Sequence, residues 1–106
     1  TPLLGAHQAT NAVTALAMLE AAGPAWALAP DAAQAALDTV RLAGRFQRVG
    51  PWLFDVAHNA EGAATVVRSL AATGAATGPL GAVICVLRDK DWPRMLATLL
   101  PQVDHC

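Results

Sequence analysis

Two short polar clusters contain the residue types that could do chemistry. One is DVAHN at 55–59, which follows an apolar run, and the other is RDKD at 88–91, which follows a second one. If both runs are strands of an open parallel sheet, the clusters lie side by side at its ligand-binding edge, because ligands bind at the carboxyl ends of such strands. The alternative is a pair of solvated loops that cap the helices behind them, since loops are usually polar.

Asp55 and His58 form the more specific pair within the first cluster. A carboxylate at the end of a strand, with an imidazole three residues later at the entrance of a helix, can hold a ribose hydroxyl or a carboxylate substrate. The structural alternative is that Asp55 caps backbone amides and His58 makes only local hydrogen bonds. The pair alone leaves both interpretations open.

Arg45 directly follows Gly44, where a new sequence pattern begins. An Arg at such a junction suits a triphosphate, because its planar guanidinium binds phosphate oxygens through two parallel hydrogen bonds. A surface Arg on a strand is the alternative.

His7, Gln8 and Asn11 share one side of a predicted helical turn. The i, i+4 spacing could bind a metal, but no third ligand is evident, so no metal site is predicted.

Hydrophobic periodicity predicts the elements that must position these residues. The first forty residues predict two helices, at 7–22 and from Asp31 to residue 40, with Asp31 and Gln34 as a capping box. Alternating polarity and a Gly-Pro turn then predict a hairpin formed by 45–49 and 52–55.

The remaining residues predict a helix, a strand and a further helix. The helix covers 60–73, the uninterrupted apolar run at 82–87 is typical of a strand buried on both faces, and Asp91 caps a helix that ends at Leu100. Another strand would begin at Val103. This order predicts an α/β fold with three layers, a mostly parallel sheet and right-handed crossovers. The sheet would be unfinished, which indicates a piece of a longer protein.

Composition narrows the function classes. The chain has 106 residues, a net charge of −1, 55% hydrophobic residues and 14% charged residues. Near-neutral charge gives no field that attracts a polyanion, so neither nucleic acid nor a membrane is an expected partner. Cys85 and Cys106 form no CxxC pair, which indicates the reducing cytoplasm. Cys85, inside the apolar run, is expected to be buried and unreactive.

Taken in order, the motifs resemble a known family. They are LGAHQ at 4–8, NA at 11–12, GRF at 44–46, FDVAHN at 54–59 and DKD at 89–91. This set resembles the bifunctional folylpolyglutamate synthase/dihydrofolate synthase family of the Mur ligase superfamily. Each motif alone is weak, whereas the ordered set is specific and covers nearly the whole chain. The chain departs from the family at Ala43 and Ala60, where the family often has proline, and neither departure removes a polar contact.

The resemblance implies a domain organisation. Residues 1–41 would be the end of the central ATPase domain with its linker helices, and residues 42–106 would be part of the C-terminal Rossmann-like ligase domain. The phosphate loop, the magnesium ligands and most of the folate pocket of the family would lie upstream. This segment alone is therefore expected to be inactive, and the parent enzyme is expected to be cytoplasmic and monomeric.

The resemblance also implies a reaction. The parent enzyme would use ATP and Mg2+ to join L-glutamate to dihydropteroate or a reduced folate through an acyl phosphate, in folate biosynthesis. Asn11 would contact the adenine of ATP, Arg45 would reach the phosphates, and Asp55 would bind the ribose or another part of the nucleotide.

The remaining site residues would act on the second substrate. By the same resemblance, His58 would be a catalytic residue near the incoming glutamate. Asp89 and Lys90 would line the same cleft, where Lys90 could attract a carboxylate. The most useful single experiment is ATP- and glutamate-dependent phosphate release by the full-length protein, with dihydropteroate compared with a tetrahydrofolate, and a cheap discriminator is whether a phosphate loop of the GTNGKGS type lies upstream.

Two alternatives stay open. A sibling Mur-type or cyanophycin-type amino-acid ligase would use the same Arg and Asp-x-Ala-His pattern, although Gln8 after His7 and Asn59 after His58 favour the folate branch. A non-catalytic Rossmann-like module that binds a partner protein would need none of these roles, and the absence of the upstream phosphate loop would favour it.

Overall fold

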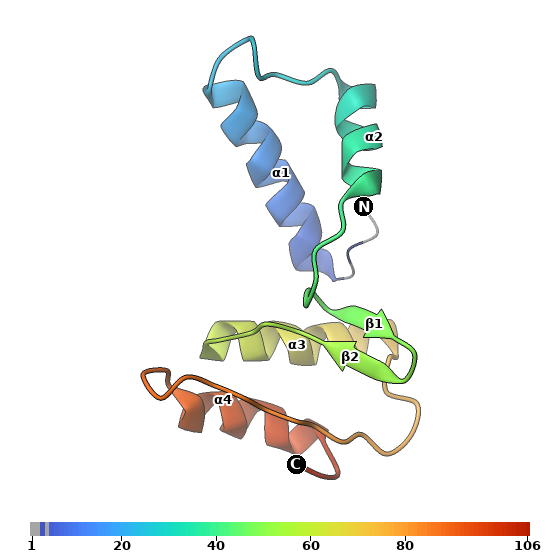
Figure 1. Cartoon of the computed structure of the whole chain (residues 1–106), viewed down its shortest axis with the longest axis vertical. Coiled ribbons are helices and arrows are strands. Elements are labelled where there is room, and N and C mark those ends of the chain that lie inside the picture. Colours follow the sequence, from blue (N-terminus) through green and yellow to red (C-terminus); the bar gives the residue numbers. More distant parts are fainter. Residues whose placement is uncertain (1–2, 4) are drawn as a thin grey trace. The chain divides into compact units, whose positions relative to one another are not determined.

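The computed structural model describes residue 3 and residues 5–106, whose elements are shown in Figure 1. The chain divides into two compact units, Thr1–Phe54 and Asp55–Cys106. The boundary expected from the sequence falls after residue 41, and the assignment of the two parts to domains of a ligase stays a prediction. Leu4, which begins the first motif, lies outside the described residues.

Two helices form the first part of the first unit. They are α1, Ala6–Ala21, and α2, Pro30–Thr39, which confirm the two helices predicted from periodicity. The predicted capping box at Asp31 is wrong, because α2 begins one residue earlier, at Pro30. Proline has no N–H and a fixed φ, so it suits the first helical position. The amide of Gln34 instead donates a hydrogen bond to Oδ1 of Asp38, 2.9 Å away.

A hairpin completes the first unit. β1, Gln47–Val49, pairs antiparallel with β2, Trp52–Phe54, which confirms the predicted hairpin. Gly50 takes the left-handed conformation in the turn, with φ at 57°, where a side chain would be strained. Phe46, just before β1, has φ at 48° although it is not glycine, and it is 2% exposed. Burial of its ring holds the strained backbone at this point.

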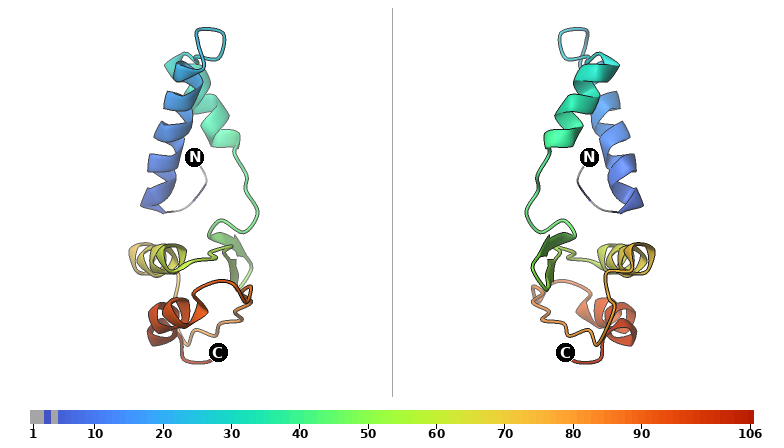
Figure 2. Two further views of the ribbon diagram at one scale, coloured as in Figure 1. Left: turned by 90° about the vertical axis from the view of Figure 1, so that its left-hand side faces the viewer. Right: turned by 90° about the vertical axis from the view of Figure 1, so that its right-hand side faces the viewer.

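The second unit contains two helices that pack against each other (Figure 2). They are α3, Ala60–Thr73, and α4, Trp92–Leu99, and both confirm predicted helices. Ala63 on α3 is fully buried, and Met95 on α4 is 1% exposed. A short 3-10 helix, η1 at Leu100–Gln102, follows α4 directly.

Polar side chains and a glycine cap the helix ends in the second unit. Oδ1 of Asn59 accepts a hydrogen bond from the backbone N–H of Gly62 at 2.7 Å and so caps α3. Gly74 ends the same helix in the left-handed conformation, with φ at 58°. Asp91 caps α4, as predicted, by accepting from the N–H of Arg94 at 3.3 Å.

The predicted buried strand at 82–87 is wrong. These residues form no strand, and their exposure alternates: Val83 is 93% exposed and Leu87 is 71% exposed, whereas the residues between them at 84 and 86 are half-buried. Cys85 is likewise exposed rather than buried. An apolar run cannot by itself distinguish a strand covered on both faces from an extended segment covered on one.

The mostly parallel sheet of the expected three-layer fold is not seen in residue 3 and residues 5–106. Their one sheet is the antiparallel hairpin, and their one parallel pairing is an isolated bridge between Gly81 and His105. The strand expected to begin at Val103 is reduced to this bridge. A Rossmann-like sheet therefore stays a prediction. Over the same described ranges, no helix has both the length and the apolar character that crossing a bilayer requires.

Candidate functional site

A hollow of about 280 Å³ in the second unit contains residues from both polar clusters. Its lining consists of Asp55, Val56, Ala57, His58, Cys85, Val86, Leu87 and Lys90. The first four belong to the loop that leads into α3, and the other four belong to the segment that leads toward α4. The structure therefore brings Asp55, His58 and Lys90 to one place, although they are up to 35 residues apart in the sequence.

Local hydrogen bonds fix the loop that carries Asp55 and His58. Oδ1 of Asp55 accepts from the backbone N–H of Ala57 at 2.8 Å, which is an Asx turn. Nδ1 of His58 lies 3.2 Å from the carbonyl oxygen of Val56. Because a carbonyl only accepts, Nδ1 is the donor in this bond, and the tautomer with its proton on Nδ1 has its lone pair on Nε2. The local bonds thus orient His58 with an acceptor nitrogen for a ligand.

Lys90 supplies the positive charge of the hollow. Its Nζ lies 2.8 Å from Oδ2 of Asp89, and the Lys90 side chain is 33% exposed. The hydrogen bond from Lys90 holds the pKa of Asp89 below its ordinary value. Asp89 does not line the hollow itself. It is the partner of Lys90, and it competes with any incoming carboxylate for the ammonium group.

Asn11 and Arg45 belong to the first unit, and both are exposed. Nδ2 of Asn11 donates to Oε1 of Gln8 at 3.1 Å. Arg45 precedes the buried Phe46 at the start of the hairpin. Neither Asn11 nor Arg45 lines the hollow of the second unit, so their contacts with a nucleotide stay predictions.

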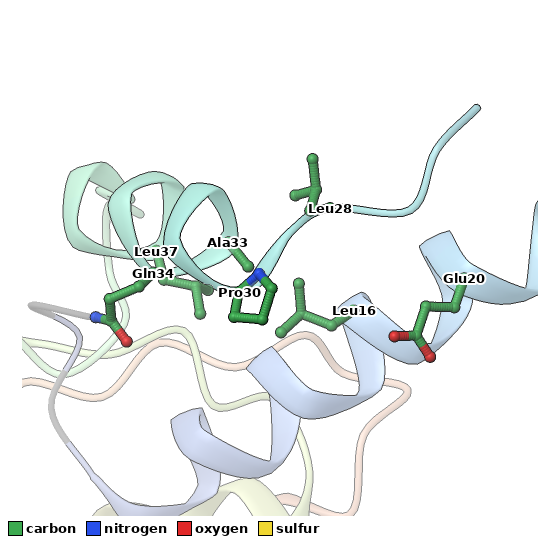
Figure 3. A pocket seen from close by; sticks show the side chains of 7 residues that line it. All are labelled: Leu16, Glu20, Leu28, Pro30, Ala33, Gln34 and Leu37. Atoms are coloured by element: carbon green, nitrogen blue, oxygen red, sulfur yellow. The ribbon is translucent and has the colours of Figure 1, made fainter. Parts of the chain in front are cut away.

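The first unit has a hollow of its own, also of about 280 Å³ (Figure 3). Leu16 on α1 points toward Pro30 and Leu28 on the opposite side, and Glu20 and Gln34 are the polar lining residues. No residue that the sequence predicted to contact nucleotide or substrate lines this hollow.

The sequence analysis missed Cys85, Val86 and Leu87 as lining residues because it placed them inside a buried strand. Their position just before the second polar cluster was the available signal, since ligands meet the ends of such segments. Among residue 3 and residues 5–106, no group of three or more His, Cys, Asp or Glu side chains could hold a metal ion.

Comparison with known proteins gives one informative result. No protein-family model matches the chain, and no solved structure matches it significantly. Among curated proteins, the dihydrofolate synthase/folylpolyglutamate synthase of Mycobacterium tuberculosis is 42% identical over 109 aligned positions. The chain is similar to one segment of that synthase. The match covers 97% of this chain and 22% of the mycobacterial synthase, so the chain spans about a fifth of that relative.

Proposed function

We propose that this chain is a segment of a cytoplasmic ATP-dependent ligase that adds L-glutamate to dihydropteroate or to a reduced folate. The observation that carries the proposal is the 42% identity to the mycobacterial synthase over 97% of the chain. The ordered motifs, which lie within the aligned region, agree with this proposal. The hollow in the second unit adds to it, because it combines the carboxylate of Asp55, the imidazole of His58 and the ammonium of Lys90.

The proposed reaction has two steps. A carboxylate oxygen of the folate substrate attacks the γ-phosphorus of ATP, the bond to the β-phosphate oxygen breaks, and ADP leaves. The amine of L-glutamate then attacks the carbonyl carbon of the acyl phosphate, loses a proton and expels phosphate as the amide forms. Phosphoryl transfer depends mainly on positioning and on stabilisation of charge, so the protein needs well-placed donors more than a covalent group.

Asn11, Arg45 and Asp55 are assigned to the nucleotide. The amide of Asn11 can both donate to and accept from a purine edge. The guanidinium of Arg45 suits two parallel bonds to phosphate oxygens. Asp55 is held in its Asx turn by the N–H of Ala57, so its carboxylate is ordered before a ribose hydroxyl arrives.

His58 and Lys90 are assigned to L-glutamate. Nδ1 of His58 is engaged with the Val56 carbonyl, so Nε2 is the nitrogen that can take the proton lost by the attacking amine. Lys90 binds a carboxylate of L-glutamate, and Asp89, 2.8 Å from its Nζ, holds the ammonium until the substrate comes.

Magnesium is implied by the resemblance and would offset charge on the phosphates of ATP. The described residues contain no cluster of three metal-ligating side chains. The resemblance places the magnesium ligands upstream of this segment, so no step of the reaction is assigned to them here.

The experiment that tests the proposal follows an isotope. The full-length protein is given ATP, L-glutamate and dihydropteroate whose carboxylate carries a heavy oxygen isotope. We expect a glutamylated product and inorganic phosphate that contains the heavy oxygen. Product without isotope in the phosphate would contradict the acyl phosphate. Absence of glutamylated product with both dihydropteroate and a reduced folate would contradict the function.

A further inference from the structure

We propose that Asp89 is a specificity-determining residue that makes the hollow of the second unit select an amino dicarboxylate over a plain dicarboxylate. The inference rests on the proposed function, in which Lys90 binds a carboxylate of L-glutamate. It names the group that discriminates against glutarate, which has the carbon chain and both carboxylates of L-glutamate but no amine. Glutarate cannot form an amide, so it would occupy the hollow without reacting.

Lys90 is held in the wall of the hollow by bonds of its backbone and of its side chain. Its backbone N–H donates to the carbonyl oxygen of Leu87 at 3.1 Å, and its carbonyl oxygen accepts from the N–H of Trp92 at 2.8 Å. Its Nζ donates to Oδ2 of Asp89 at 2.8 Å. An ammonium group has three N–H donors, and the bond to Asp89 uses one of them. The group can therefore also donate to a carboxylate that enters the hollow.

Asp89 acts on the hollow through its charge, because it does not line the hollow itself. The hydrogen bond from Lys90 lowers the pKa of Asp89, so this carboxylate is ionised at neutral pH. Its side chain is 67% exposed, and solvent and salt weaken its electrostatic effects without removing them at short range. Asp91 has a different role, since it accepts from the backbone N–H of Arg94 at 3.3 Å and caps α4. Asp89 is thus the acidic residue bonded to the ammonium of Lys90.

The charge of Asp89 favours a ligand that carries an amine. L-Glutamate and glutarate share two carboxylates, and Asp89 repels these in both ligands. L-Glutamate also has an ammonium group, which Asp89 attracts in every orientation of the ligand, because opposite charges attract at any distance. Asp55, which lines the hollow with Lys90, acts in the same direction. Two carboxylates around one ammonium therefore select the ligand with the smaller net negative charge.

The test measures binding to the full-length protein by calorimetry, with ADP in place of ATP so that no reaction consumes the ligand. The quantity compared is the Kd of glutarate divided by the Kd of L-glutamate. Asp89→Asn keeps the size of the side chain and an acceptor for Lys90 but removes the charge. We expect this variant to lower the ratio by about two- to fivefold, the range of an exposed charge pair. Lys90→Met should weaken the binding of both ligands, which locates them in the hollow.

Asp91→Asn is the matched control, because it removes the same charge next to Lys90 while asparagine caps a helix as well as aspartate does. Its ratio should equal that of the wild type. An unchanged ratio in Asp89→Asn would overturn the inference. So would an equal fall in both variants, unchanged affinities in Lys90→Met, or a wild type that binds neither ligand. Should Asp89→Asn not fold, Asp89→Ser removes the same charge and is judged by the same ratio.

The outcomes separate the inference from the proposed function. A full-length protein that forms glutamylated product but keeps its ratio in Asp89→Asn retains the proposed function and loses only this inference. A protein that shows the expected ratios but never forms glutamylated product loses the proposed function, whereas selection by the charge of Asp89 is upheld.

Discussion

Gly62 and Ala57 lie so close together that a side chain at position 62 would push the loop before α3 away by a few tenths of an ångström. A Cβ at Gly62 would lie 3.1 Å from Cβ of Ala57 and 3.2 Å from Oδ1 of Asn59. The N–H of Gly62 also donates to that Oδ1 at 2.7 Å. The loop that carries Asp55 and His58 therefore packs directly against the first turn of α3.

Gly62→Ala should impair the site more than the fold. Alanine is favoured over glycine inside a helix by about 1 kcal/mol, which offsets the strain of moving the loop by a few tenths of an ångström. We expect a nearly unchanged melting temperature and a higher KM for L-glutamate in the full-length enzyme. Gly78→Ala is the matched control, because a Cβ there meets nothing within 4 Å. A wild-type KM in Gly62→Ala would show that the contact does not position the site.

Asn59→Ala should destabilise the second unit. The substitution removes the side-chain oxygen that caps α3, and loss of such a cap costs about 1 kcal/mol. Asn59→Asp keeps an acceptor of the same length and should retain the stability. Chemical denaturation of the three proteins gives the free energies of unfolding, and equal destabilisation in both variants would show that capping is not the cause.

Lys90→Met should raise the pKa of Asp89. In the wild type, the hydrogen bond from Lys90 lowers that pKa from its ordinary value of 3.8. A depressed pKa in the folded state means that the pairing stabilises the fold above the ordinary value and is lost as the pH falls through the lowered one. NMR titration of the carboxyl carbons measures the change. Asp38, whose pKa is lowered by the Gln34 amide, should not move and is the internal reference.

Both cysteines should react with a thiol reagent in the folded protein. Cys85 and Cys106 are each exposed, contrary to the burial expected of Cys85 from its apolar neighbours. Only Cys85 lines the hollow with His58 and Lys90. We therefore expect a substrate bound in the hollow to slow the modification of Cys85 and to leave the rate of modification of Cys106 unchanged. Mass spectrometry after brief labelling measures both rates. Equal protection of both thiols, or of neither, would argue against ligand binding in the hollow.

Much of the fold could be predicted because residues close in the sequence determine where the helices and the hairpin turn lie. Periodicity located the helices, Gly50 and Pro51 located the hairpin turn, and Asp91 was identified as a helix cap. The segment at 82–87 could not be predicted in the same way, because its burial depends on what packs against it rather than on its own residues. Asp31 was misjudged because Pro30 begins the helix one residue earlier.

The site was partly predictable for a related reason. Polar residues after apolar runs pointed to Asp55, His58 and Lys90, and the structure brings all three to one hollow. The ion pair of Lys90 with Asp89 and the bonds of Gln8 to its neighbours could not be read from spacing. They depend on rotamers and burial, which become visible only when the side chains are placed.

Asp55, His58 and Arg45 are proposed to serve a ligase that couples ATP to glutamate addition. Release of phosphate by the full-length protein tests it most directly, with melting temperatures recorded for each variant. We expect release only when ATP, L-glutamate and a pteroate or folate acceptor are all present. In Arg45→Ala, we expect the rate of release to fall by about ten- to a hundredfold, because the lost charged hydrogen bonds contribute about 1.5–3 kcal/mol. His58→Ala should raise the glutamate requirement, and Asp55→Ala should weaken ATP binding. Phosphate release that is independent of L-glutamate, or wild-type kinetics in all three variants despite lower melting temperatures, would contradict it.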